Sequence, residues 1–136
     1  IVFAPASPAS SVVWNPVAFA KRYGMRETLI EALICARPDF HHESKYWENT
    51  ARKAVSSALR HASIDSPAAV HDLFDNPLAL RDLARASNDP TLTDLAGSMG
   101  TGSVNAATAL TDIIGRLYPF VRSDAIRAVL SGRVRN

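Results

Sequence analysis

Cysteine is nearly absent from this 136-residue sequence, which contains only Cys35. One cysteine excludes a disulfide framework within the chain and is typical of proteins from a reducing compartment. Long apolar runs are also missing, since the longest are a few residues against the ~20 that a membrane-spanning helix needs. No basic segment accompanies the apolar start Ile1-Val2-Phe3. We therefore expect neither a signal peptide nor direct insertion into a membrane.

The sequence also lacks an initiator methionine and begins directly on an apolar run. This start predicts that the chain is a piece cut from a larger protein. Its length fits one domain. With 47% hydrophobic and 21% charged residues, the composition is that of a soluble globular domain that buries a core.

Neither sign of charge dominates, because 15 basic residues face 13 acidic ones for a net charge of +2. The small surplus lies after residue 100 and consists only of arginine, namely Arg116, Arg122, Arg127, Arg133 and Arg135. A sequence pI of about 9.0 with so small a net charge is a weak indication of nucleic-acid binding. We interpret these arginines first as a solvated basic face.

A repeated dipeptide, a capping residue followed by proline, predicts four helix starts. The side chain of Asn, Ser or Asp accepts a backbone N–H of the first turn, and proline loses no hydrogen bond there. The four pairs are Asn15-Pro16, Ser66-Pro67, Asn76-Pro77 and Asp89-Pro90, and the further N-cap candidates are Ser44, Ser103 and Ser123. Apolar periodicity completes the prediction of helices over residues 26–36, 44–62, 67–74, 77–86, 91–99, 103–118 and 124–130.

The clearest amphipathic pattern lies in residues 44–62, where small apolar residues recur at helical spacing. Its stripe consists of Trp47, Ala51, Ala54, Val55, Ala58, Leu59 and Ala62. A stripe in such register indicates a core-facing surface, so we place Trp47 in the core rather than on a surface where bases could stack on it. The predicted fold is all-α, a compact bundle of about six to eight helices with an extended N-terminal arm.

Two segments resemble ligand sites only weakly. Gly97, Gly100 and Gly102 precede a predicted helix, where backbone amides can hold a phosphate. The segment contains no Gly-Lys-Ser/Thr and follows no strand, so we interpret it as a flexible connection between helices. The His-His-Glu sequence at residues 41–43 lacks the ligand spacing of a zinc site and is predicted to be a solvated loop.

No residue stands in a recognisable catalytic pattern. Cys35 lies on or beside the apolar stripe of its helix, which indicates a small core side chain. No serine lies in a Gly-x-Ser-x-Gly turn. Glu27 and Glu31 share a helix face, but two surface carboxylates one turn apart are common and do not define an acid–base pair. We therefore predict a non-catalytic chain without cofactor or metal.

Three stretches carry a family resemblance. The opening from Phe3 to Pro16 resembles a segment of type IV secretion coupling proteins of the TraG/TraD kind, in which a strand leaves an ATPase domain through a Pro/Ser-rich stretch. Trp47-Glu48-Asn49-Thr50-Ala51, leading to Ala58-Leu59, is similar to the tryptophan and small-residue helix of that family. The stretch over residues 102–126 is similar to the part before the family's chain returns to its ATPase domain.

The resemblance implies the all-alpha domain that is inserted into a RecA-like, hexamer-forming ATPase of the bacterial inner membrane. Residues 1–14 are then the arm from the parent ATPase domain, residues 15–132 the substrate-recognition domain and residues 133–136 the return linker. An insertion also demands that both ends leave the helical body on the same side. The domain would lie on the cytoplasmic side of the membrane and bind secreted effector proteins, their C-terminal signals, or a relaxase.

The C-terminal arginine surplus supplies the candidate contacts. We choose Arg116, Arg122 and Arg127 as partner-binding residues for an acidic or amide-rich signal. One alternative is a DNA- or relaxosome-contacting helical module of a conjugative coupling protein, whose phosphate contacts would make its affinity fall steeply with salt. Another is a structural spacer or oligomerisation domain of the ATPase ring, which would bind no secreted protein.

Overall fold

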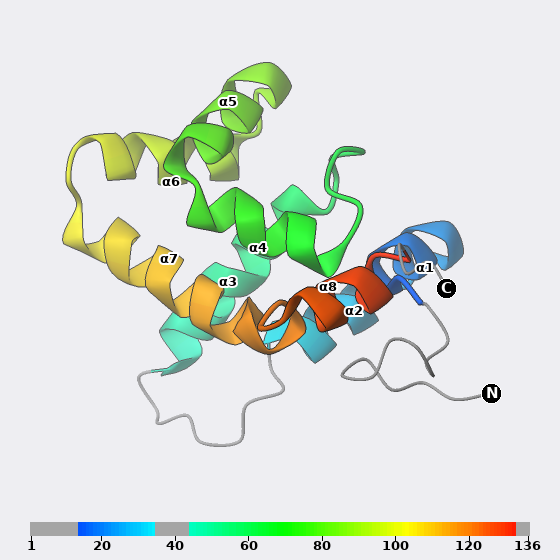
Figure 1. Ribbon diagram of the computed structural model, residues 1–136. Coiled ribbons are helices and arrows are strands. Elements are labelled where there is room, and N and C mark those ends of the chain that lie inside the picture. Colours follow the sequence, from blue (N-terminus) through cyan, green and yellow to red (C-terminus); the bar gives the residue numbers. More distant parts are fainter. Residues whose placement is uncertain (1–13, 35–43, 133–136) are drawn as a thin grey trace.

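The computed structural model describes residues 14–34 and 44–132, and within these ranges every regular element is helical (Figure 1). The predicted all-α class is therefore confirmed. The predicted arm before Trp14, the return linker, Cys35 and the histidines at positions 41 and 42 lie outside the described residues. The elements are α1 (Pro16–Tyr23), α2 (Arg26–Ile34), α3 (Ser44–Ala58), α4 (Pro67–Asp75), α5 (Pro77–Ser87), α6 (Pro90–Gly100), α7 (Val104–Leu117), the 3₁₀ turn η2 (Tyr118–Phe120) and α8 (Asp124–Leu130).

The helix starts lie where the capping pairs predict them. In each of the four pairs, the side-chain oxygen of the first residue accepts a first-turn backbone N–H at 3.0–3.3 Å. Ser103 and Ser123 cap α7 and α8 in the same way. Six helix starts are thus determined by local chemistry, independently of how the helices later pack.

Two predicted boundaries are wrong. The helix predicted over residues 44–62 ends at Ala58, where the chain enters a series of turns. The glycine segment is less open than expected, because α6 continues through Gly97 to Gly100 and only residues 101–103 connect it to α7. The positive φ of +73° at Gly102 ends α6, and glycine adopts that angle without strain.

Helix α7 lies at the centre of the body and packs against α2, α3, α4 and α6. Its Ile113 and Leu117 are completely buried. The alanine stripe of α3 is buried as predicted, from Ala51 to Ala58. Side chains this small allow neighbouring helices to approach closely, which explains how a chain of this length encloses its core.

The placement of Trp47 in the core is wrong. Its side chain is half-buried at the N-terminal end of α3 and packs edge-to-face on the exposed Tyr46, with ring centroids 4.8 Å apart. Residues of the stripe are fully buried only where other helices pack against them. At the first turn of α3 this packing is incomplete. Periodicity predicts the direction of a side chain, whereas burial depends on what lies opposite.

Helix α1 is fastened to the turn that follows α3. The Lys21 ammonium donates to the carbonyl oxygens of His61, at 2.8 Å, and Ile64, at 2.5 Å, and the Asn15 amide donates to the carbonyl of Asp65 at 2.6 Å. Burial lowers the pKa of Lys21 below its ordinary value. The two bonds from Lys21 are charge-assisted, and all three bonds hold α1 to the turns that follow α3.

The two ends of the helical body lie next to each other. The backbone N–H of Trp14, the first described residue, donates to the carbonyl oxygen of Val129 in α8 at 3.1 Å. Figure 1 accordingly places the beginning of α1 beside the end of α8. The first and last described helices therefore meet on one side of the body.

Candidate binding groove

One wall of a strongly apolar surface groove is the hairpin of α1 and α2. Gly24 ends α1 in the left-handed region, at φ +67°, and the N–H of Met25 donates to the carbonyl of Ala20 at 2.8 Å. This turn reverses the chain within two residues, so α2 returns along α1. Phe19 and Met25 from the first helix and its turn, with Leu29 and Leu33 from the second, line the same side.

The opposite wall comes from about 100 residues later in the chain. After α7, the turn η2 presents Phe120, and Ser123 starts α8 by accepting the N–H of Ile126 at 3.2 Å. Ile126 and Leu130 lie one turn apart on α8 and face the hairpin. The bond between Trp14 and Val129 holds the two walls together at one end.

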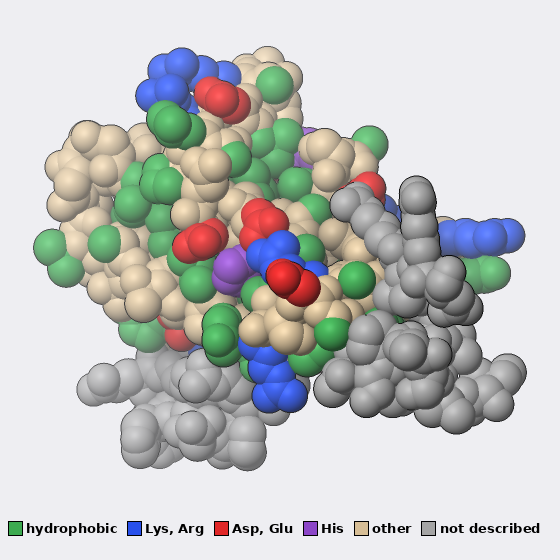
Figure 2. Space-filling view, in the orientation of Figure 1, with side chains coloured by type: hydrophobic (Ala, Val, Ile, Leu, Met, Phe, Trp, Pro, Cys, Tyr) green, Lys and Arg blue, Asp and Glu red, His purple; other side chains and the backbone are tan. Residues whose placement is uncertain are grey.

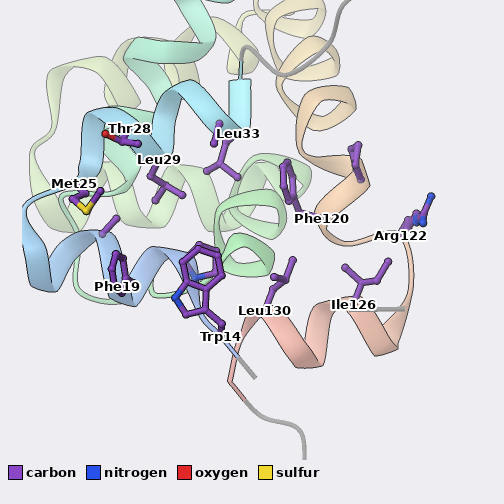
Figure 3. A pocket seen from close by; sticks show the side chains of 14 residues that line it. Trp14, Phe19, Met25, Thr28, Leu29, Leu33, Phe120, Arg122, Ile126 and Leu130 are labelled. Carbon is purple, nitrogen blue, oxygen red and sulfur yellow. The ribbon is translucent and has the colours of Figure 1, made fainter. Parts of the chain in front are cut away.

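The groove has a volume of about 490 Å³, and its side chains converge on a common space (Figure 3). Its floor is made of buried apolar residues of α2 and α8. Its edges expose large apolar side chains, because Trp14, Phe19 and Met25 keep between 40% and 45% of their surface in contact with water. Apolar surface gathered in this way is typical of a site that another molecule covers.

An aromatic row continues the groove along α1. Trp14 packs edge-to-face on Phe19 with ring centroids 5.8 Å apart, and Phe19 packs on Tyr23 at 4.8 Å. Tyr23 is 58% exposed, and the Arg22 guanidinium lies 5.4 Å from the centre of its ring. The apolar surface is therefore longer than a closed cavity, and it ends beside a cation.

Arg122 is the one charged residue among the groove-lining residues that the structure describes. It lies on the segment between η2 and α8, is exposed, and is drawn at the rim of the groove in Figure 3. Among the described residues it forms no ion pair. Of the three arginines chosen from the sequence, Arg122 alone combines exposure with a place on this groove.

Arg127 is engaged within the protein. Its guanidinium donates two hydrogen bonds to the Asp72 carboxylate, at 2.6 and 3.1 Å, which joins α8 to α4. His71 lies 3.0 Å from the same carboxylate, and Figure 2 shows this mixture of acidic, basic and histidine side chains over α4 and α8. The hydrogen bonds from Arg127 lower the pKa of Asp72, and those to Asp72 raise the pKa of Arg127. The pair fixes the groove's α8 wall on the body.

The placement of Arg116 on a basic surface is wrong. Its side chain is fully buried, and its Nε donates to Asp112 at 2.7 Å while Nη1 donates to the carbonyl of Ile34 at 2.6 Å. It therefore joins the end of α2 to α7, the helix that leads into η2. Arg116 presents no surface to a partner, and its bonds hold the end of one groove wall, α2, against α7.

Three other hollows on the surface are less apolar. Two of them adjoin Trp47, one beside Val104 and Asp112 and the other beside Lys53 and Asp94. A third lies between α5 and α6 and is lined largely by small and polar residues. None of the three exposes a row of large apolar side chains like the one on α1.

The described histidines are structural. His61 lies 3.3 Å from the Asp89 carboxylate, which caps α6 and is 6% exposed. Burial disfavours the charged form of Asp89, but the backbone N–H of Leu92, the ring of His61 and the N–H of Thr91 outweigh it and lower its pKa. Across the described ranges, no three His, Cys, Asp or Glu side chains gather as metal ligands.

Acid should destabilise the protein through Asp72 and Asp89. The pKa of each carboxyl group is lower in the folded chain than in the unfolded chain, where it is about 3.9. Each carboxylate therefore stabilises the folded state at pH values above about 3.9. This stabilisation is lost as the pH falls through the lower pKa of the folded state. Urea unfolding between pH 7 and pH 2.5 measures the loss. Below pH 4, the free energy of unfolding of a double variant, Asp72→Asn with Asp89→Asn, should depend less on pH than that of the wild type. The control variant Asp82→Asn, at an exposed position, should show the pH dependence of the wild type. Equal pH dependence in all three proteins would contradict the assignment.

Comparisons with protein-family models, with curated proteins and with solved structures found no match to this chain. None of the helices in residues 14–34 and 44–132 is long and apolar enough to cross a membrane. The groove residues Phe19, Met25 and Phe120 were not predicted from the sequence as a site. The sequence carries a local signal for Phe19, which lies in a row with Trp14 and Tyr23 at five- and four-residue spacing.

Proposed function

We propose that this chain is the all-alpha substrate-recognition domain of a type IV secretion coupling protein of the TraG/TraD kind, and that it docks secreted proteins in the groove between α1, α2 and α8. The open apolar groove carries the proposal. Large side chains such as Phe19 and Met25 are 40–41% exposed. A partner that covers them removes apolar surface from water, which stabilises the complex. The resemblance at Phe3–Pro16 and at Trp47 supplies the family.

The position of the groove supports the same function. Trp14 lines it, and Val129, to which Trp14 is bonded, lies between Ile126 and Leu130 on α8. In an inserted domain both connections to the parent ATPase would leave beside this groove. A cargo bound there would lie close to the ATPase ring that moves it, on the cytoplasmic side of the bacterial inner membrane to which the parent is anchored.

Binding, and not catalysis, is the chemistry that we propose. The polar side-chain groups on the groove are the Thr28 hydroxyl, the Trp14 indole N–H and the Arg122 guanidinium. They include no base beside a nucleophile, which acyl or phosphoryl transfer would need. A groove open along one side favours reversible binding of moderate affinity, as handing a cargo onward requires, and it needs neither cofactor nor metal.

Charging the edge of the groove should weaken docking. In the double variant Phe19→Asp with Met25→Asp, we expect affinity for a secreted protein to fall at least about tenfold, because two carboxylates would be desolvated against an apolar partner. The partner is first identified with a photo-crosslinker in place of Tyr23, introduced in the bacterium that carries this sequence. Titration calorimetry with the purified partner then gives the affinity.

Leu78→Asp is the matched control, since Leu78 is 60% exposed on α5 and lines none of the grooves described above. It should bind the partner as the wild type does. Unchanged affinity in the groove variant would overturn the docking proposal. Capture of DNA alone, with an affinity that falls by about 0.9 log units per log unit of salt for each phosphate contact, would favour the DNA-contacting alternative. Absence of any secreted partner would favour the spacer.

A further inference from the structure

We infer that the segment held in this groove is a short amphipathic helix that places a carboxylate against Arg122. The inference rests on the docking function proposed above and specifies its ligand. Three observations lead to it: the backbone that borders the groove, the shape of its apolar surface and the charge at its rim.

The backbone around the groove favours a helical ligand. One way for an extended peptide to bind is to add a strand to a free sheet edge, and residues 14–34 and 44–132 contain no strand that offers such an edge. The groove is lined by helices and by the short turns that join them, so we expect the side chains of the ligand to make most of its contacts. A helix with apolar residues at i, i+3, i+4 and i+7 satisfies its own backbone and presents one apolar stripe to such walls.

The apolar surface is elongated rather than round. It runs from Leu130 and Ile126 on α8, past Trp14 and Phe19, to the exposed ring of Tyr23 on α1. A small molecule would fill the groove of about 490 Å³ and leave Tyr23 uncovered. A helix of two or three turns, rising 5.4 Å per turn, can cover both.

The rim carries an uncompensated positive charge. Arg122 is exposed and has no ion-pair partner in the part of the chain that the structure describes. Its neighbour Arg127 is taken up by Asp72, and none of the groove's lining residues is a carboxylate. A second copy that paired groove to groove would bring the same arginine and no carboxylate, because the lining contains none. A ligand carboxylate beside the apolar stripe can accept two parallel hydrogen bonds from the guanidinium.

The test uses two synthetic helical peptides labelled with fluorescein, each with four leucines at i, i+3, i+4 and i+7 and differing only in a flanking Glu or Lys. Fluorescence anisotropy measures their binding to the 136-residue chain. We expect the Glu peptide to bind about fivefold more tightly than the Lys peptide. Arg122→Glu should reverse this preference, and the exposed Arg85→Glu on α5 should preserve it.

The outcomes separate the ligand from the function. Arg122→Glu that leaves the preference unchanged would overturn the carboxylate assignment. The peptides could fail to bind although the double variant Phe19→Asp with Met25→Asp still loses affinity for the crosslinked partner. That result would overturn the helical ligand and leave the docking function intact. If the groove variant binds both the peptides and the partner as the wild type does, the docking proposal itself is overturned. Reversal by Arg122→Glu, together with competition between the Glu peptide and the partner, supports the inference.

Discussion

Replacing Arg116 with alanine should lower the free energy of unfolding by about 3 kcal/mol and the melting temperature by about 10 °C. The guanidinium is fully buried and hydrogen-bonded to the Asp112 carboxylate and to the carbonyl of Ile34. Its removal leaves a cavity and takes away the donors of both acceptors. The value lies at the lower end for a broken buried ion pair because the Asp112 side chain, 17% exposed, can reach water.

Arg122→Ala is the matched control, since that arginine is exposed and should change the stability by less than about 0.5 kcal/mol. Thermal unfolding followed by circular dichroism measures both variants. Arg116→Ala should also weaken ligand binding, because Arg116 holds the end of one groove wall, α2, against α7. A melting temperature equal to that of the wild type would show that Arg116 does not hold these helices together.

Phe74→Ala should be at least as damaging, lowering the free energy of unfolding by about 3–5 kcal/mol. Phe74 is 1% exposed and among the largest completely buried side chains that the structure describes. Its helix, α4, packs against α5, α7, η2 and α8, so a cavity left by the missing ring lies among several elements. No single helix can move to fill it without disturbing the others.

Phe74→Leu provides a graded comparison, because it keeps most of the buried apolar surface and should lose less stability than alanine. Leu78→Ala, on the exposed side of α5, should leave the stability nearly unchanged. Urea denaturation at pH 7 gives the three values from their midpoints. The core assignment would be contradicted if Phe74→Ala and Leu78→Ala lost equal stability.

Local chemistry made the helix starts predictable. Asn15, Ser66, Asn76 and Asp89 each precede proline, and each caps the helix that follows. A cap involves a side chain and backbone groups two or three residues away, so nothing distant alters it. Helix ends were less predictable, because α3 stops at Ala58, before the end of its apolar stripe.

The three arginines chosen as a surface site differ only through packing. Arg116, Arg122 and Arg127 look equivalent in a list of charges, yet one is buried, one is exposed and one is paired with Asp72. The spacing of Asp112 and Arg116 at i and i+4 hints at their pair. Nothing in the sequence indicates that the carbonyl of Ile34, 82 residues away, completes the site.

The sequence by itself determined that the chain is helical and where most of its helices begin, because capping and apolar periodicity act over a few residues. It also determined which face of α3 turns inward. Only the tertiary structure decided that Trp47 is only partly buried, that Arg116 is internal and that an apolar groove opens between α1, α2 and α8. The groove joins residues about 100 positions apart, and its form depends on how whole helices pack, which no local pattern encodes.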